Sequence, residues 1–352
     1  MSDNVNDRNV HDSGGDDDRL DVVAVGNALV DVLARAPDED LGRLGLLKGS
    51  MELVDLARSA TVYGGMGAGV EVSGGSGANT AVGVAALGGR VGYIGKVADD
   101  TFGVTFLHDI LAAGVEQAHI SKVPGSDAPG AEQATGRCLI LVTEDGERTM
   151  ATHLGVASSL GPDDLDEGLL ARAQVVYLEG YLWDQPPAKK ALRRAMEVAH
   201  NADALVALTL SDPFCVSRNR REFLDLVHGE VDVLFANEEE VTMLFDVGNF
   251  DDAVTAVEET GLLAALTRGA AGSVIVAASG PVAVAAEPVE RVVDTTGAGD
   301  LFAAGFLYGL THGYDPESCG RLAGLCAGEI ISHLGARPQA DLKLLIKEAG
   351  LS

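Results

Sequence analysis

Cysteine is scarce in this sequence. The four cysteines, Cys138, Cys215, Cys319 and Cys326, form no C-x-x-C pair and have no histidines at metal-binding spacing. This pattern favours buried, reduced thiols over a disulfide framework or a zinc site. No uncharged apolar run is long enough to span a membrane, and no apolar segment typical of a signal peptide follows Met1. We therefore expect a cytoplasmic protein.

Positive charge is also scarce. The chain has 25 lysines and arginines against 53 acidic residues, which gives a formal net charge of −28. Nucleic acids and anionic membranes are polyanions, so neither is expected as a partner. Part of the acidic excess lies in residues 1–19, which contain few large apolar side chains and are predicted to form a disordered acidic tail. A chain of this charge that binds a phosphate compound must supply positive potential locally.

Aromatic residues make up only 5% of the chain, whereas apolar residues reach 47% and glycine occurs 44 times. This composition suits an α/β fold in which an open, mostly parallel central sheet has helices on both faces. Residues 20–352 are predicted to form this single domain. Its first strand is expected at residues 21–26, and strands and helices alternate further along. Among them are a strand at 91–95 and helices at 220–228 and 319–334.

Two nucleotide-binding fingerprints are missing. After the first strand the sequence reads Gly26-Asn27-Ala28-Leu29-Val30-Asp31 and not G-x-G-x-x-G, which argues against a dinucleotide-dependent oxidoreductase. The G-K-[ST] signature of a Walker-type kinase occurs nowhere. Asn27 and Asp31 nevertheless follow a buried strand directly. Open parallel sheets bind their ligands at that position.

The most informative stretch is residues 294–300, which leads into the apolar segment 301–310. Gly297, Ala298 and Gly299 are small residues at a predicted helix start, where free N–H groups and the helix dipole favour an anion such as phosphate. Asp300 would repel that anion, so it needs a separate role. Accepting the proton of an attacking hydroxyl is one such role, and an ordinary helix start is the alternative.

A second glycine-rich helix start lies at residues 73–81 and carries Gly75, Ser76 and Asn79. Together the two segments resemble the paired signatures of the ribokinase-like (PfkB) family of carbohydrate and nucleoside kinases. The resemblance extends from Asp21 through most of the chain. The residues of these motifs are most similar to those of bacterial adenosine kinase-like members of the family.

The resemblance implies roles for these residues. Asp300 would be the catalytic base, and Gly297, Ala298 and Gly299 would form the anion hole. The acceptor would be held by five residues: Asn27, Asp31, Gly75, Ser76 and Asn79. A non-catalytic binding protein on this scaffold would be expected to lose Asp300 or the glycines, yet all are present. The helix dipole is expected to make Asp300 less basic.

Further motifs resemble the family's nucleotide side. Asn237 and Glu240 match its N-x-x-E motif, in which Glu240 would position Mg²⁺ mostly through water; a capped helix start is the alternative. Thr267, Gly269 and Gly272 match a T-x-G-x-x-G turn at the nucleotide, with a plain hairpin turn as the alternative. The region 319–334 would line the adenine.

The resemblance also implies a small β lid, with strands from about 32–72 and 137–153. Residues 138–142 and 148–152 read as a hairpin of this lid. Arg148 could face the substrate or the transferred phosphoryl group, but the interpretation favoured from the sequence is that it flanks the turn.

The implied reaction is phosphoryl transfer from ATP, with Mg²⁺, to the 5′-hydroxyl of a nucleoside. Conversion of adenosine to AMP in purine salvage is favoured, and phosphorylation of a hexose or ribose is the alternative. The resemblance leaves room for a monovalent cation. It is compatible with a monomer or a homodimer.

Overall fold

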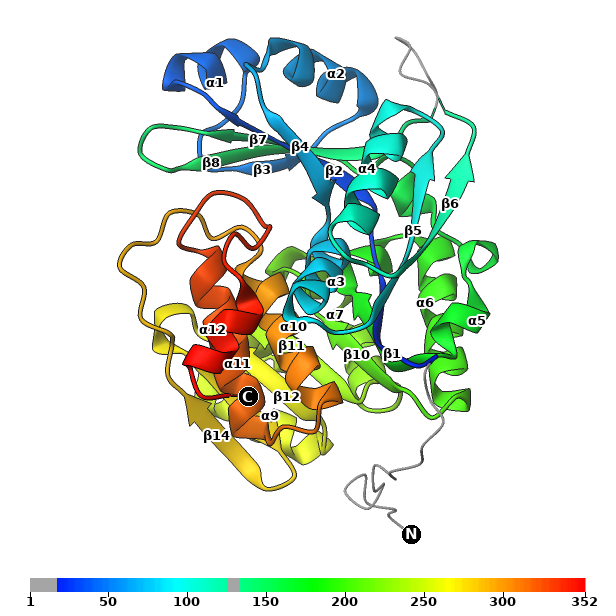
Figure 1. Ribbon diagram of the computed structural model, residues 1–352, viewed down its shortest axis with the longest axis vertical. Helices are drawn as coiled ribbons and strands as arrows, with labels where there is room; N and C mark the ends of the chain where they lie inside the picture. The colour runs from blue at the N-terminus through cyan, green and yellow to red at the C-terminus, as the bar shows by residue number, and fades with distance from the viewer. Residues whose placement is uncertain (1–17, 126–132, 352) are drawn as a thin grey trace.

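The computed structural model describes residues 18–125 and 133–351. Residues 1–17 of the predicted tail lie outside this part, while Asp18 accepts a hydrogen bond from Arg172 (2.6 Å). The larger of two sheets has nine strands in the order β14-β13-β12-β11-β10-β9-β1-β5-β6 (Figure 1). Its strands are β1 (Leu20–Val25), β5 (Val91–Ala98), β6 (Gln117–Val123), β9 (Ala173–Glu179), β10 (Leu205–Thr209), β11 (Val233–Asn237), β12 (Leu263–Thr267), β13 (Ser273–Ala277) and β14 (Gly280–Val284).

The strands from β12 to β6 pair in parallel, whereas β13 and β14 pair antiparallel at one edge. This arrangement confirms the predicted α/β class with a mostly parallel sheet. Alternate side chains of each strand point to opposite faces, so Val22 and Ala24 of β1 enter one core while Val23 and Val25 enter the other. Because both faces are buried, the strands read as continuous apolar runs.

Helices cover both faces of the large sheet. The core on one face contains side chains of α3 (Ser76–Leu87), α4 (Thr101–Ala112), α10 (Ala298–Thr311), α11 (Pro316–Ile330) and α12 (Leu342–Glu348). The core on the other face contains side chains of α5 (Glu167–Leu170), α6 (Pro186–Asn201), α7 (Pro213–Val227), α8 (Glu238–Phe245) and α9 (Phe250–Thr260). Short 3₁₀ turns lie at Gly155–Ser159, Pro162–Asp164, Gly180–Asp184 and Gly269–Ala271.

Small residues bring α10 close to its two neighbours. A Cβ at Gly83 of α3 would lie 2.5 Å from the Cβ of Ala304, and one at Gly305 would lie 2.8 Å from the Cα of Ala323 in α11. Larger side chains at these positions would force the helices apart. The packing therefore fixes where α10 begins relative to α3.

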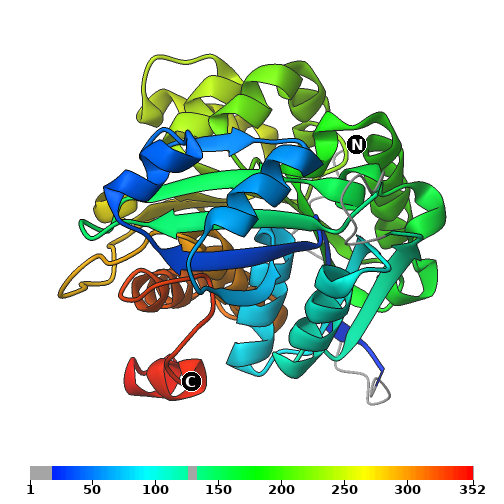
Figure 2. The same cartoon turned by 90° about the horizontal axis from the view of Figure 1, so that it is seen from above.

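The second sheet has five strands in the order β3-β8-β7-β2-β4. They are β2 (Leu29–Arg35), β3 (Met51–Leu53), β4 (Val70–Gly74), β7 (Gly136–Val142) and β8 (Arg148–His153), and the helices α1 (Asp38–Leu44) and α2 (Leu56–Gly65) lie beside them. Strands β7 and β8 form the predicted hairpin. Only residues 26–28 separate β1 from β2, so the small sheet stands over the carboxyl ends of the parallel strands (Figures 1 and 2).

Several boundaries differ from prediction. Strand β5 continues to Ala98 because it pairs with β6 from Gly92 to Ala98. Helix α7 begins at Pro213, since Asp212 caps it by accepting from the N–H of Cys215 (2.6 Å). Helix α11 covers Pro316–Ile330 and not 319–334, because the chain after Ile331 turns back toward the loop before α10.

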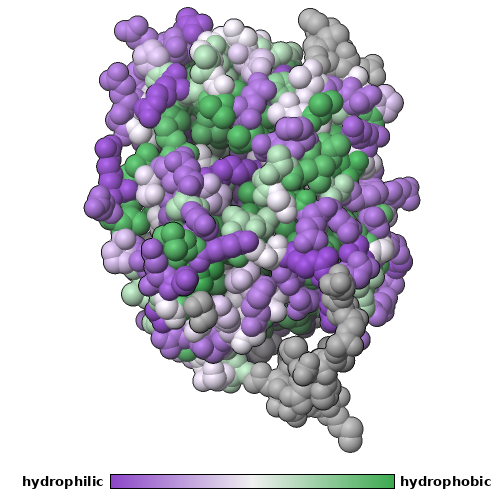
Figure 3. Space-filling model, viewed as in Figure 1, coloured by the Kyte–Doolittle hydropathy of each residue, from purple (hydrophilic) through white to green (hydrophobic). Residues whose placement is uncertain are grey.

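Figure 3 shows one face of the molecule coloured by hydropathy. Hydrophilic residues are spread over this whole face, with apolar residues between them. Among the described residues, no helix combines the length and apolar character needed to cross a membrane.

Candidate active site

The two glycine-rich helix starts meet at one point. Asp300 lies in the first turn of α10, and its Oδ1 accepts from the hydroxyl of Ser76 (2.7 Å) while its Oδ2 accepts from Nδ2 of Asn79 (2.9 Å). Asn79 and Asp300 are 221 residues apart in the chain. The hydroxyl of Thr80 also donates to the backbone oxygen of Asp300 (3.2 Å). The structure therefore brings Ser76, Asn79 and Asp300 together.

The start of α10 has the form of an anion cradle. Gly297 is left-handed (φ 77°), and a Cβ there would lie 2.8 Å from the Cβ of Ala336. The N–H of Ala298 donates to the oxygen of Thr295 (3.2 Å), whereas those of Gly297 and Gly299 find no acceptor in the described part of the chain. A Cβ at Gly299 would meet nothing within 4 Å. Free donors beside open space at a helix N-terminus fit a phosphate group.

Asp31 and the glycine-rich segment are packed tightly against each other. Asp31 lies on β2 and is only 6% exposed. A Cβ at Gly74 would overlap the carboxylate of Asp31, and one at Gly75 would overlap the backbone oxygen of Asn27. Gly75 is also at φ 93°, in the region that favours glycine. These two positions therefore require glycine.

Glu179 is a buried carboxylate that the sequence analysis missed. It ends strand β9, is fully buried, and accepts hydrogen bonds from the N–H of Asn27 (2.6 Å) and of Gly77 (2.8 Å). The side-chain amide of Asn27 donates to the same carboxylate. Glu179 thus ties the segment after β1 to the start of α3. An acidic residue that ends a buried apolar strand is the signal that could have identified it.

Burial makes the carboxyl groups of this cluster more basic than free carboxylates. It raises the pKa of Asp31 to about 7, with Asp300 adding to the rise and Arg337 opposing it. It raises the pKa of Glu179 to about 6. Burial also raises the pKa of Asp300, against hydrogen bonds from Asn79 and Ser76. The expectation that the helix dipole leaves Asp300 less basic is wrong, because desolvation outweighs it.

Arg148 connects the small sheet to the loop before α10. Its Nε forms an ion pair with Asp294 (3.1 Å), and its guanidinium donates to the hydroxyls of Thr295 (2.8 Å) and Thr296. The side chain of Asp294 is fully buried and also accepts from the N–H of Gly335 (2.9 Å). The interpretation that Arg148 merely flanks a turn is therefore wrong. Arg148 places positive charge beside the anion cradle.

Arg337 is a second residue of the site that the sequence analysis left without a role. Its Nη1 donates to Oδ1 of Asn79 (2.7 Å), and its Nη2 donates to the hydroxyl of Ser73 (2.7 Å) and to the backbone oxygen of Ser73. Its position in the turn 335–338 after a buried helix was the available signal.

The nucleotide-side motifs lie side by side. Asn237 and Thr267 are register partners at the carboxyl ends of the parallel strands β11 and β12. Asn237 caps α8 by accepting from the N–H of Glu240 (2.8 Å), and both carboxylate oxygens of Glu240 accept from Asn237 (2.9 and 2.7 Å). Burial raises the pKa of Glu240 to about 7. The motif is therefore a capped helix start, and the water-mediated Mg²⁺ remains a prediction.

Within the described residues, no group of three or more histidine, cysteine and acidic side chains could hold a metal ion.

The turn after Thr267 joins β12 to the antiparallel strand β13, so it is a hairpin turn. Gly269 is left-handed (φ 55°) with open space where a Cβ would be. Gly272 is also at positive φ (85°), and a Cβ there would overlap the backbone oxygen of Val284. Contact of this turn with a nucleotide remains a prediction.

Electrostatics connect the two ends of the site. Tyr181 follows β9, and burial is the largest cause of the raised pKa of its hydroxyl. Four charges raise this pKa further, those of Asp212, Asp300, Glu179 and Glu240. The carboxyl ends of β1, β9, β10, β11 and β12 are neighbours along one edge of the sheet. With strands spaced ~4.8 Å apart, this edge spans about 19 Å from β1 to β12.

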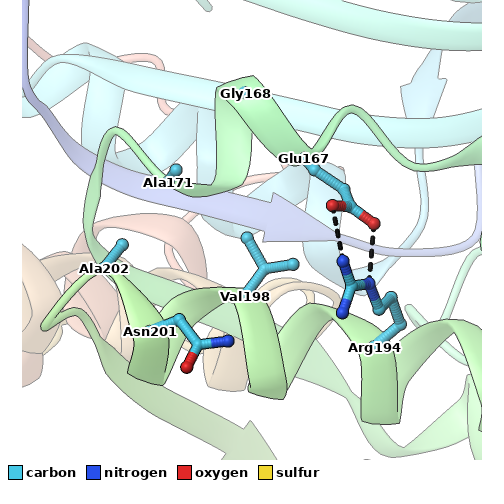
Figure 4. Close-up of a pocket in the computed structure, with 7 residues that line it drawn as sticks. All are labelled: Glu167, Gly168, Ala171, Arg194, Val198, Asn201 and Ala202. Carbon is cyan, nitrogen blue, oxygen red and sulfur yellow. Dashed lines mark hydrogen bonds and ion pairs between the residues drawn. The ribbon is translucent and has the colours of Figure 1, made fainter.

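A surface hollow elsewhere does not belong to this site. It lies between α5 and α6, where Arg194 donates to both carboxylate oxygens of Glu167 (2.6 and 2.7 Å; Figure 4). Its lining residues include none of those that surround Asp300. Its two charged side chains, Arg194 and Glu167, are paired with each other, so the carboxyl edge of the sheet remains the candidate.

A carboxylate at a helix N-terminus next to free backbone donors, at the carboxyl edge of an open parallel sheet, is an arrangement that suits phosphoryl transfer. Residues 53–342 match the pfkB family of carbohydrate kinases. The chain belongs to this family and is a kinase.

Similar proteins include both nucleoside and sugar kinases. The crystal structure of adenosine kinase from Sinorhizobium meliloti is 47% identical, has a TM-score of 0.84, and the match covers 94% of this chain and 99% of that one. A probable sugar kinase from Rhizobium etli is 45% identical with a TM-score of 0.85, covering 95% and 99%. Adenosine kinase from Saccharomyces cerevisiae is 31% identical over 324 residues, covering 84% of this chain and 90% of the yeast protein.

Proposed function

We propose that this kinase transfers the γ-phosphoryl group of ATP to the 5′-hydroxyl of a nucleoside, converting adenosine to AMP in purine salvage. One observation carries the proposal. The carboxylate of Asp300 is hydrogen-bonded to Ser76 and Asn79 on the acceptor side and stands in the first turn of α10, beside the free N–H groups of Gly297 and Gly299. A base and an anion cradle are thus within one helical turn.

In the proposed reaction the 5′-oxygen forms a bond to the γ-phosphorus as the bond to the bridging oxygen breaks, and ADP leaves. Asp300 accepts the hydroxyl proton, and its raised pKa favours that step. The N–H groups of Gly297 and Gly299 stabilise charge on the phosphoryl oxygens. Mg²⁺ bound with ATP supplies further neutralisation, and Asn237 and Glu240 would hold its water ligands.

The charges of the acceptor pocket support a neutral acceptor. The charge of Asp300 raises the pKa of both Asp31 and Glu179, and the charge of Arg337 opposes the rise at Asp31 and at Asp300. A carboxylate or phosphate on the acceptor would meet this negative potential in a region of low dielectric. Hydroxyl groups can donate to the same carboxylates without that cost.

The identity to the adenosine kinase of S. meliloti favours a nucleoside over a free sugar. The nearly equal identity to the probable sugar kinase of R. etli makes a hexose or ribose the alternative acceptor.

The test is a screen of adenosine, inosine, ribose and fructose with Mg²⁺ and ATP, with ADP release as the readout. We expect adenosine to give the highest kcat/KM. Preference for ribose or fructose would establish the alternative, and no ADP above the acceptor-free rate with any of them would contradict both. The Asp300→Asn variant, prepared identically, controls for contaminating kinases.

A further inference from the structure

Arg337 lies in the middle of a hydrogen-bond chain that ends at the proposed base. Asp109 of α4 accepts from the hydroxyl of Ser73 (2.6 Å), and Ser73 accepts from Nη2 of Arg337 (2.7 Å). Nη1 of Arg337 donates to Oδ1 of Asn79 (2.7 Å), whose Nδ2 donates to Asp300 (2.9 Å). Four segments far apart in the sequence are thereby linked.

This chain determines which way the amide of Asn79 faces. A guanidinium has only donors, so the amide oxygen must face Arg337. The amide NH₂ is then directed at Asp300, where it stabilises the ionised carboxylate. With the amide turned over, the oxygen of Asn79 would oppose Asp300 and its NH₂ would oppose Arg337, so both contacts would be lost.

We propose that Arg337 is the positioning residue of the acceptor site: it orients Asn79 toward Asp300 and provides the positive charge that Asp31 and Asp300 share. This inference rests on the proposed role of Asp300 as the base. Arg337 acts through Asn79 and through its charge, without being a proton acceptor itself.

The surrounding charges agree with this role. The titratable groups whose charges act on Arg337 come from four elements: Asp31 of β2, Asp109 of α4, Asp300 of α10 and Tyr93 of β5. The charge of Arg337 lowers the pKa of Asp31 and of Asp300, against the effect of burial. The charge of Asp300 also raises the pKa of Glu179, Tyr177 and Tyr181, which lie on β9 and in the turn after it.

One donor of Arg337 is unused. Its Nε is buried and has no hydrogen-bond partner among the described residues. A guanidinium in a closed structural network would have all its buried donors paired. The network around Arg337 therefore leaves one buried donor unsatisfied.

The experiment compares the pH dependence of kcat/KM in three variants of the full chain. Arg337→Met removes the charge and the donors, whereas Arg337→Lys keeps the charge but lacks the two Nη donors of the guanidinium. Arg194→Met is the matched control at the surface ion pair of Figure 4. Removing the charge raises the pKa of Asp31 and Asp300 further. In Arg337→Met the acidic limb of the kcat/KM pH profile should therefore move to higher pH by about one unit.

We expect kcat of Arg337→Met to fall at least about tenfold, because Asn79 is no longer held toward Asp300. Arg337→Lys should keep the acidic limb near that of the wild type but should also lose turnover. Arg194→Met should change neither quantity. The proposal would be overturned if Arg337→Met kept both the kcat and the acidic limb of the kcat/KM pH profile of the wild type. It would also be overturned if this acidic limb shifted as far in Arg337→Lys as in Arg337→Met.

A second readout does not depend on activity. The folding stability of Arg337→Met should fall more steeply between about pH 5 and pH 7 than that of Arg194→Met, because the further raised pKa of Asp31 keeps its proton bound in the folded state there while the unfolded state has lost it. If the wild type phosphorylates no acceptor, the proposed function fails while this measurement still decides the role of Arg337. If Arg337→Met does not fold, a stable Arg337→Lys supports the charge role and an equally unfolded one overturns it.

Discussion

Asp300 is held from one side by a different helix, and this contact decides what it can do. Ser76 and Asn79 each donate to one oxygen of its carboxylate, so the group is oriented before any substrate arrives. Burial raises its pKa above that of a free aspartate. A carboxylate that is both oriented and more basic is suited to accept a proton from a hydroxyl at the start of α10.

The Asp300→Asn variant tests this role at the level of one functional group. Asparagine has nearly the same shape but cannot take up the proton, so we expect kcat to fall by about 10²–10⁴-fold. ATP affinity should be unchanged or higher, since a negative charge beside the phosphates is lost. Turnover is measured by ADP release and ATP affinity by calorimetry. A kcat within about threefold of the wild type would exclude Asp300 as the base.

At the scale of the element, two helix starts use glycine for different reasons. At the start of α3, Gly75 has a positive φ (93°) and no room for a Cβ, so the backbone itself requires glycine. At the start of α10, Gly299 has open space where a Cβ would be. The first glycine serves the fold, whereas the second leaves room for a ligand.

The two substitutions to alanine should therefore separate stability from activity. Gly75→Ala should lower the free energy of unfolding by about 2 kcal/mol or more, because of its positive φ and the overlap with Asn27. Gly299→Ala should change stability by less than about 0.5 kcal/mol but should weaken ATP binding and turnover. Urea unfolding and steady-state kinetics on both proteins provide the comparison. Normal kinetics in Gly299→Ala would argue against an anion cradle at that position.

At the scale of the whole molecule, a net charge of −28 is combined with a cluster of buried carboxylates of raised pKa. Asp31 has a pKa of about 7 when folded against 3.8 for a free group. The folded state thus binds more protons than the unfolded state between these values. The stability linked to Asp31 is fully present below about pH 3.8 and is lost as the pH rises toward about 7.

We therefore expect the free energy of unfolding of the wild type to decrease from about pH 5 to pH 8. In Asp31→Asn this decrease should be smaller than in the wild type by on the order of 2–3 kcal/mol. Repulsion among exposed carboxylates acts in the same direction but is screened by salt. Urea unfolding at about 1 M NaCl isolates the buried contribution. Equal pH dependence of the wild type and Asp31→Asn at high salt would contradict the raised pKa.

The class of fold and the helix starts followed from the sequence. Apolar runs ended by polar residues predicted the parallel strands and the edge at which the site lies, because strand pattern and turn chemistry are local properties. The motif at residues 294–300 identified Asp300 and its glycines for the same reason. The boundaries of α7 and α11 were less well predicted, since a single cap such as Asp212 decides where a helix begins.

Only the tertiary structure revealed the partners of these groups. Glu179, Arg148 and Arg337 lie between about 100 and 260 positions from the residues that they hold, and no local pattern marks such contacts. The sequence analysis also predicted too weak a base at Asp300, because the helix dipole lowers the pKa of its carboxyl group and the opposing effect of burial cannot be seen in a sequence. Which effect prevails depends on how many protein atoms exclude water from the carboxylate, and folding alone determines that number.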